Sequence, residues 1–109
     1  MAYDEQLAER VRDVLELREE VTERKMFGGI AFMLRGNMAC GVIDDDLIVR
    51  VGPDEYERAL AEGHTREFDF TGRPSKGIVV VSAEGVATDE ALSEWVDAGA
   101  DFAASLPQK

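Results

Sequence analysis

The chain has 109 residues, 45 % of them apolar, which is enough for one hydrophobic core and too little for two. Its formal net charge is −11, and an acidic surface repels phosphate backbones, so we expect no direct binding to nucleic acid. A lone cysteine, Cys40, excludes an internal disulfide and, with one histidine, excludes Cys/His zinc sites. With neither a basic leader nor an apolar run of about 20 residues, we expect a cytoplasmic protein without a membrane span.

Residues 3–20 predict an amphipathic helix at the start of the chain. Leu7, Val11 and Leu15 recur at helical spacing with charged residues between them, and neither glycine nor proline interrupts the stretch. We expect the acidic face of this helix to be solvated. Its apolar face would then pack against the rest of the domain.

Apolar residues alternate with a period of two between residues 24 and 51, which predicts antiparallel strands. The pair Gly36-Asn37 suits a two-residue hairpin turn because both residues tolerate positive φ. The run Asp44-Asp45-Asp46 predicts the next turn, and a short additional strand can precede the others at residues 23–26. The three main strands fall at residues 30–34, 38–43 and 47–51.

A short helix is predicted after Gly52-Pro53, which ends this meander. Proline suits the first helical position, and the carboxylates of Asp54 and Glu55 suit the positive end of the helix dipole. Gly63 is predicted to end the helix in a left-handed conformation, because glycine adopts positive φ without steric cost.

Two more strands and a final helix complete the pattern. Phe68 and Phe70 alternate with acidic residues, and residues 77–82 include a β-branched run. Thr88 is predicted to cap the last helix, which ends before Pro107. One face of that helix is apolar: Leu92, Trp95, Val96, Gly99, Phe102, Ala103 and Leu106.

The predicted element order is α-β-β-β-α-β-β-α. Hairpin-connected strands with helices at both ends and between them predict an α+β fold, in which one antiparallel sheet packs against helices. Neither an internal repeat nor a low-complexity linker divides the sequence. We therefore expect residues 1–109 to form a single domain.

The residue types give little support to catalysis. His64 is the only histidine, and a hydrolase would pair it with Ser75, but the G-x-S-x-G elbow and the phosphate-binding glycine loops are absent. The Asp44-Asp45-Asp46 run lacks EF-hand spacing, and Cys40 lies in an apolar stretch, where a thiol packs as a small core side chain. We therefore predict no catalytic residue, no metal site and no cofactor.

Two glycine-containing segments escape the acidic bias. Residues 22–43 hold three bases and one acid, and residues 65–82 hold three bases and two acids. The first contains Lys25-Met26-Phe27-Gly28-Gly29, where paired glycines indicate either close approach of a partner or ligand, or a bulge or bend in the strand. The second contains Gly72-Arg73-Pro74-Ser75-Lys76-Gly77, a stiff loop whose cations either bind an anionic group or pair with neighbouring acids.

These two segments motivate a binding hypothesis. We expect the side chains of Lys25, Arg50, Arg73 and Lys76 to converge around the paired glycines and to bind an acidic group of a partner. The candidate binding residues are Lys25, Met26, Phe27, Gly28, Gly29, Arg50, His64, Gly72, Arg73, Pro74 and Lys76.

From about residue 25 to its end, the chain carries a series of short motifs in a fixed order. They are Met26-Phe27-Gly28-Gly29, Gly36-Asn37-Met38-Ala39, Asp46-Leu47-Ile48-Val49-Arg50, Phe70-Thr71-Gly72-Arg73-Pro74, and Trp95 through Phe102 to Leu106-Pro107. In these motifs the sequence resembles the TfoX (Sxy) N-terminal domain family. The resemblance implies a secretion-chaperone-like α+β fold, and the best-known members regulate competence genes in bacteria and carry a second, C-terminal helical domain, which we do not expect here. The family has no established catalytic residues.

The resemblance and the charge pattern together imply a small bacterial regulatory or protein-interaction module. It would dock a protein partner, such as a component of the transcription machinery, and a homodimer through exposed sheet edges is a further option. The alternative is an enzyme or accessory subunit acting on RNA or a small anionic metabolite. A pocket lined by His64, Arg73 and Ser75 would favour the alternative, and an apolar patch bordered by Met26 and Phe27 would favour the module.

Overall fold

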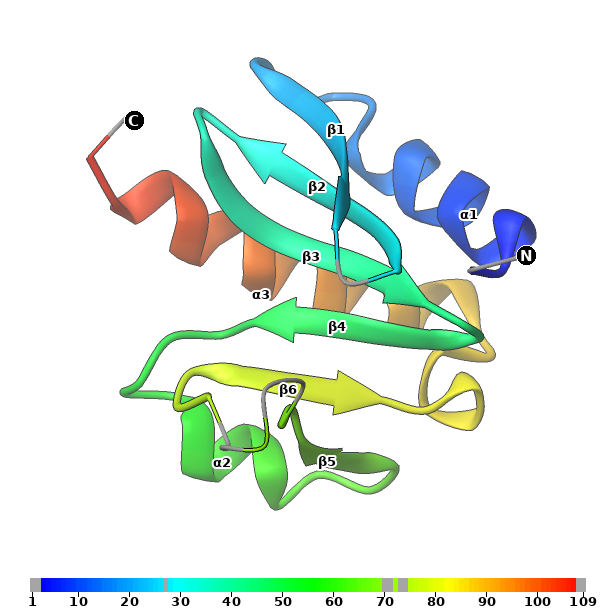
Figure 1. The fold of residues 1–109 in the computed structure, drawn as a ribbon, viewed down its shortest axis with the longest axis vertical. Helices are drawn as coiled ribbons and strands as arrows, with labels where there is room; N and C mark the ends of the chain where they lie inside the picture. Colours follow the sequence, from blue (N-terminus) through cyan, green and yellow to red (C-terminus); the bar gives the residue numbers. More distant parts are fainter. Residues whose placement is uncertain (1–2, 27, 70–71, 73–74, 108–109) are drawn as a thin grey trace.

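The structure is a computed structural model that describes residues 3–26, 28–69, 72 and 75–107. These residues form a six-stranded antiparallel sheet with the strand order β1-β2-β3-β4-β6-β5, shown in Figure 1. The result confirms the predicted α+β class and element order, with the short additional strand present as β1. The strands are β1 (Val21–Met26), β2 (Gly29–Leu34), β3 (Asn37–Ile43), β4 (Asp46–Arg50), β5 (Thr65–Glu67) and β6 (Ile78–Val81).

The helices of the described residues are α1 (Glu5–Leu15), α2 (Tyr56–Leu60) and α3 (Asp89–Ser105), with a 3-10 turn, η1 (Ala83–Val86), before α3. Figure 1 shows α1 and α3 behind the same face of the sheet. The carboxylate of Asp4 caps α1, and the hydroxyl of Thr88 caps α3 as predicted, by accepting from the N–H of Ala91 at 3.1 Å. None of these helices is both long enough and apolar enough to cross a membrane.

The main core lies between the sheet and the helices, because alternate residues of each central strand point toward α1 and α3. Phe32 and Leu47 of the sheet pack there with Leu92 and Val96 of α3, and all four are almost completely buried. Burying a side chain of this size contributes about 1.5–3 kcal/mol to folding. The contacts that hold α3 on the sheet therefore make a substantial contribution to the stability of the domain.

The predicted hairpin turn is wrong by one residue, and the first helix is shorter than predicted. Arg35 and Gly36 form the turn between β2 and β3, with φ of 54° and 83°. Asn37 begins β3 instead, because its side chain is buried and its amide donates a hydrogen bond of 2.9 Å to the carbonyl of Pro107 at the other end of the chain. The first helix ends at Leu15 and does not reach residue 20.

The boundaries around the second helix also differ from the prediction. α2 begins at Tyr56 and not at Pro53, because the N–H groups of residues 51 and 52 donate to the carbonyl of Gly77 and extend the strand pairing beyond β4. His64, with φ of 69°, takes the left-handed conformation expected at Gly63. Phe68 follows β5 and is not part of it, and Phe70 lies outside the described residues.

Candidate functional site

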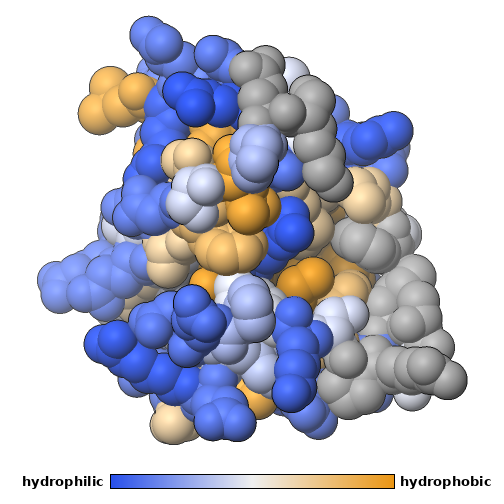
Figure 2. All heavy atoms as spheres, turned by 90° about the vertical axis from the view of Figure 1, so that its left-hand side faces the viewer, coloured by the Kyte–Doolittle hydropathy of each residue, from blue (hydrophilic) through white to orange (hydrophobic). Residues whose placement is uncertain are grey.

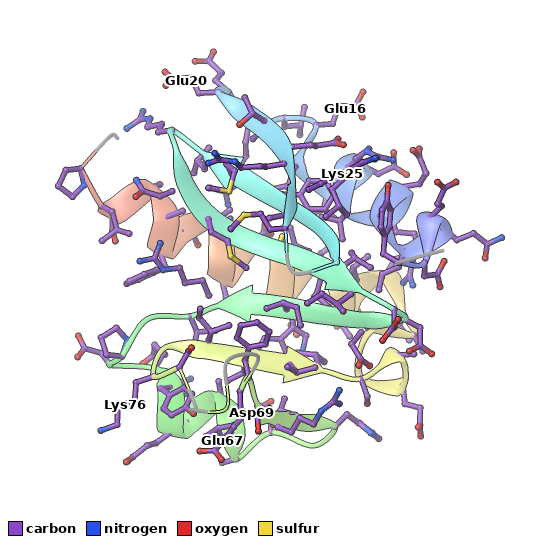
Figure 3. All side chains as sticks on the ribbon, viewed as in Figure 1. Glu16, Glu20, Lys25, Glu67, Asp69 and Lys76 are labelled. Carbon is purple, nitrogen blue, oxygen red and sulfur yellow. The ribbon has the colours of Figure 1, made fainter. Side chains whose placement is uncertain are left out.

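The predicted cationic residues lie at separate places in the fold. Lys25 is on β1, an edge strand, where it pairs with Ile30 of β2. Arg50 ends β4, so that two strands, β2 and β3, lie between it and β1. Figure 3 shows Lys25 on β1, in the upper half of the view, and Lys76 at the opposite side of the sheet, beside α2. The expected convergence of Lys25 with Arg50 and Lys76 does not occur.

Arg50 and Lys76 lie at the same end of the sheet, where β4 leaves and β6 enters. The N–H groups of residues 51 and 52 donate to the carbonyl of Gly77 at 2.7 and 3.0 Å, which joins the two segments. The guanidinium of Arg50 lies over the ring of Phe102, 5.4 Å from its centroid, in a cation–π geometry. Lys76 is exposed and makes no ion pair with any other described residue.

Both glycines of the first candidate segment have structural reasons to be glycine. Gly28 turns the chain between β1 and β2 with φ of 78°, and Met26 pairs with Gly29 across that turn. A Cβ atom at Gly29 would lie 2.1 Å from the carbonyl oxygen of Val42, far inside contact distance. The structure thus supports the bend that we had set against close approach of a ligand.

Three candidate residues, Phe27, Arg73 and Pro74, lie outside the described residues. Their binding role stays a prediction. Beside them, Gly72 is exposed and has φ of 86°, and its N–H donates to the carbonyl of Asp69 at 2.9 Å. Gly72 therefore forms a turn in the loop of residues 72–77, as the sequence predicted.

The residues with the most reactive side chains do not form a site. His64 precedes β5 and Ser75 bonds to the carbonyl of Phe68 beyond the other end of that strand, so β5 separates them. Cys40 is fully buried, and its burial raises its pKa to about 12, so the thiol is protonated at neutral pH. Among the described residues, His, Cys, Asp and Glu side chains form no group of three that would hold a metal ion.

A groove with a volume of about 520 Å³ opens between α2 and α3. Its floor is apolar and is formed by Val51, Ala59, Trp95, Ala98 and Phe102. Trp95 is the only tryptophan of the chain, and it and Phe102 remain partly exposed. Figure 2 looks onto the side of the molecule where α3 ends and shows apolar side chains in a band between hydrophilic ones.

Acidic side chains form the rim of this groove. Glu55 and Glu62 border it on the side of α2, and Glu94 and Asp101 border it on α3. One cation, Arg58, also lines it, and its guanidinium pairs with Glu55 at 3.1 Å. Glu62 and Glu94 make no ion pair with any described residue, so the rim keeps a negative charge.

The α2 wall of the groove is held in place by polar contacts with β5. The hydroxyl of Thr65 lies within hydrogen-bond distance of the carbonyls of Ala59, Leu60 and Glu62 at 3.1, 3.2 and 2.8 Å, at the end of this short helix. The hydroxyl of Tyr56 donates to the carboxylate of Glu67 at 3.3 Å. A five-residue helix has too few internal hydrogen bonds to persist alone, so these contacts fix the wall.

Two glycines fix the α3 wall. A Cβ atom at Gly99 would lie 2.3 Å from the carbonyl oxygen of Ala39, so the missing side chain lets α3 approach β3 closely. A Cβ atom at Gly52 would lie 2.4 Å from Cε1 of Phe102, so this glycine makes room for the ring on the groove floor. The depth of the groove therefore depends on residues that do not line it.

The sheet face opposite α1 and α3 carries a second, smaller apolar cluster. Met38 and Ile48 are buried there, and Met26 and Met33 are partly exposed at its margin. Methionine side chains adapt to irregular partners because they are flexible and polarisable. Met26 borders this cluster, but Phe27 lies outside the described residues, so the apolar patch that would favour an interaction module stays a hypothesis.

Sequence reasoning missed the groove, although it identified the helix that forms one wall. Trp95 and Phe102 belong to the predicted apolar stripe of α3, to which the sequence analysis assigned no binding role. The stripe is wider than the sheet can cover, because Leu92, Val96 and Ala103 already fill that contact. The sequence signal for the groove is the pair of aromatic residues Trp95 and Phe102. They lie to one side of the buried positions of α3 and next to acidic residues.

Comparison with known proteins agrees with this fold. The profile of the TfoX N-terminal domain family matches residues 13–103 of the chain. Neither a curated protein nor a solved structure matches it.

Proposed function

The chain belongs to the TfoX N-terminal domain family, and from that premise we propose that it is a small regulatory module that acts by binding a protein partner and not by catalysis. The observation that supports this proposal best is the groove between α2 and α3, in which Trp95 and Phe102 are partly exposed. Partly exposed aromatic residues in a concave apolar surface are typical of protein-binding sites, where they act as anchors.

The alternative of an enzyme acting on RNA or an anionic metabolite has less support at this groove. Its rim is acidic and would repel a phosphate or carboxylate group. His64 and Ser75, which a hydrolytic site would combine, lie beyond opposite ends of β5. The buried thiol of Cys40 is protonated at neutral pH and out of reach of a substrate.

Site-specific photo-crosslinking in the source cells tests the proposal. A photoreactive amino acid is placed singly at four exposed positions on different elements: Thr22 on β1, Lys76 before β6, and Ala98 and Ala104 on α3. We expect irradiation to give a discrete covalent adduct with a second protein from at least one position, because a docked partner brings C–H bonds within reach of the probe.

Each adduct is treated with nuclease and with protease before electrophoresis. An adduct that protease removes and nuclease leaves intact supports protein binding. If none of the four positions gives a protein adduct, or if the adduct contains nucleic acid, the proposed function is wrong.

A further inference from the structure

We infer that the groove between α2 and α3 binds a basic amphipathic helix of a partner protein. This inference rests on the proposed function and adds the surface and the chemistry of the partner. It follows from three properties of the groove: an apolar floor, an acidic rim and a wall made of one 17-residue helix.

The floor selects an apolar stripe. Trp95, Ala98 and Phe102 lie at spacings of three and four residues along α3, so they form a continuous row on one helix face. A helix that lies along this row presents its own residues at i, i+3, i+4 and i+7, which interdigitate with it. Val51 and Ala59 close the other side of the row.

The rim selects positive charge. Among the described residues, four carboxylates border the groove, and the one lining cation, Arg58, is paired with Glu55. Asp101 is partly neutralised by Arg18 at 2.9 Å, whereas Glu62 and Glu94 face the solvent from opposite walls without a described partner. Lysine or arginine residues that flank the apolar stripe of a partner would meet these two carboxylates from both sides.

A second copy of this chain does not have the required chemistry. α3 contains five acidic residues and no basic residue, and the whole chain has a net charge of −11. In α1, three acidic residues accompany two basic ones, Arg10 and Arg12, and both of these are engaged in ion pairs. The groove therefore fits a different protein.

A synthetic peptide of about 20 residues serves as the probe, with leucine at i, i+3, i+4 and i+7 and lysine elsewhere. Binding is followed through the fluorescence of Trp95, which reports on the groove directly because the chain has no other tryptophan. We expect a shift of the emission to shorter wavelength as the peptide covers the indole, and a dissociation constant that rises with salt. A peptide with glutamate in place of every lysine should not bind.

Two matched pairs of variants locate the binding. Replacing Ala98 with arginine fills the floor and should abolish binding, whereas the same change at Ala104, which is exposed on α3 outside the groove, should not. The double variant Glu62→Gln and Glu94→Gln should weaken binding by about threefold to tenfold, the effect of losing two exposed ion pairs. Glu16→Gln with Glu84→Gln removes the same charge elsewhere and should leave affinity nearly unchanged.

The inference is overturned if the glutamate peptide binds as well as the lysine peptide, if neither binds, or if both members of a matched pair behave alike. Its failure is distinct from failure of the proposed function. Crosslinks to a protein from Thr22 alone, on the edge strand β1, would place the partner on another surface and would still support the proposed function. The absence of protein crosslinks at all four positions would refute the proposed function.

Discussion

The close approach of α3 to β3 at Gly99 leads to a prediction that opposes the usual effect of helix propensity. Replacing glycine with alanine inside a helix normally stabilises it by about 0.8–1.0 kcal/mol. In Gly99→Ala, however, the new methyl group would lie 2.3 Å from the carbonyl oxygen of Ala39 and 3.3 Å from Cγ1 of Val49, where ordinary contact begins at 3.4 Å.

Ala39 lies at the register shift between β2 and β3, but its neighbours Met38 and Cys40 both pair with β2, so the sheet holds the backbone on either side of this carbonyl. The helix must therefore move outward, and overpacking of this kind costs about 1–3 kcal/mol. The upper part of that range applies, because the closest atom belongs to the backbone. After the gain in propensity is subtracted, we expect Gly99→Ala to destabilise the domain by about 1–2 kcal/mol.

Urea denaturation followed by far-UV circular dichroism measures this difference. Ala104→Gly, at an exposed position in the last turn of the same helix, is the control and should lose no more than about 1 kcal/mol from propensity alone. The outward shift should also change the emission of Trp95 in the folded state. If Gly99→Ala is as stable as the wild type or more stable, α3 is not held at the distance described, and the reasoning about the groove wall fails with it.

Three further predictions concern single side chains. Asn37→Ala should cost about 1 kcal/mol in urea denaturation, because it removes the hydrogen bond to the carbonyl of Pro107; an unchanged midpoint would contradict this. Cys40 keeps its proton up to about pH 12 in the folded protein and loses it near pH 9 in the unfolded chain. The folded state therefore binds more protons between these two values. As a result, the free energy of unfolding should fall as the pH rises from 9 to 12. Cys40→Ala should show a shallower decline of stability in that range, and parallel curves would refute the assignment. Arg18→Met should destabilise the domain by less than about 1 kcal/mol and strengthen binding of the lysine peptide, because it frees the carboxylate of Asp101; weaker peptide binding would count against the role of the rim.

Local signals were sufficient for most of the fold. The hydroxyl of Thr88 marks the start of α3 because a cap depends only on the residues that follow it. The alternation of β2, β3 and β4 was equally visible, since each of these strands has one face on the core. The hairpin turn was misplaced because Asn37 is fixed by Pro107, 70 residues away in the chain, and no local pattern contains that contact.

The candidate site was harder to predict because charge along a sequence does not give positions in space. Lys25 and Lys76 occur in similar glycine-containing segments. The strand order nevertheless separates them, because β2, β3 and β4 lie between β1, which carries Lys25, and β6, which follows Lys76. The groove depends on where α2 docks beside α3, which is decided by contacts such as that of Tyr56 with Glu67. The aromatic residues were identified correctly as part of an apolar stripe, but their exposure depends on the width of the sheet beneath them.

The sealed thiol of Cys40 also makes the domain convenient to label. Native protein should be inert toward maleimide dyes and spin labels, since the sulfur is enclosed and uncharged at neutral pH. A single cysteine introduced at an exposed site, as in Ala104→Cys, then becomes the only position to react, and the natural cysteine does not have to be removed. Distances from α3 to a bound molecule thus become measurable in an otherwise unaltered chain.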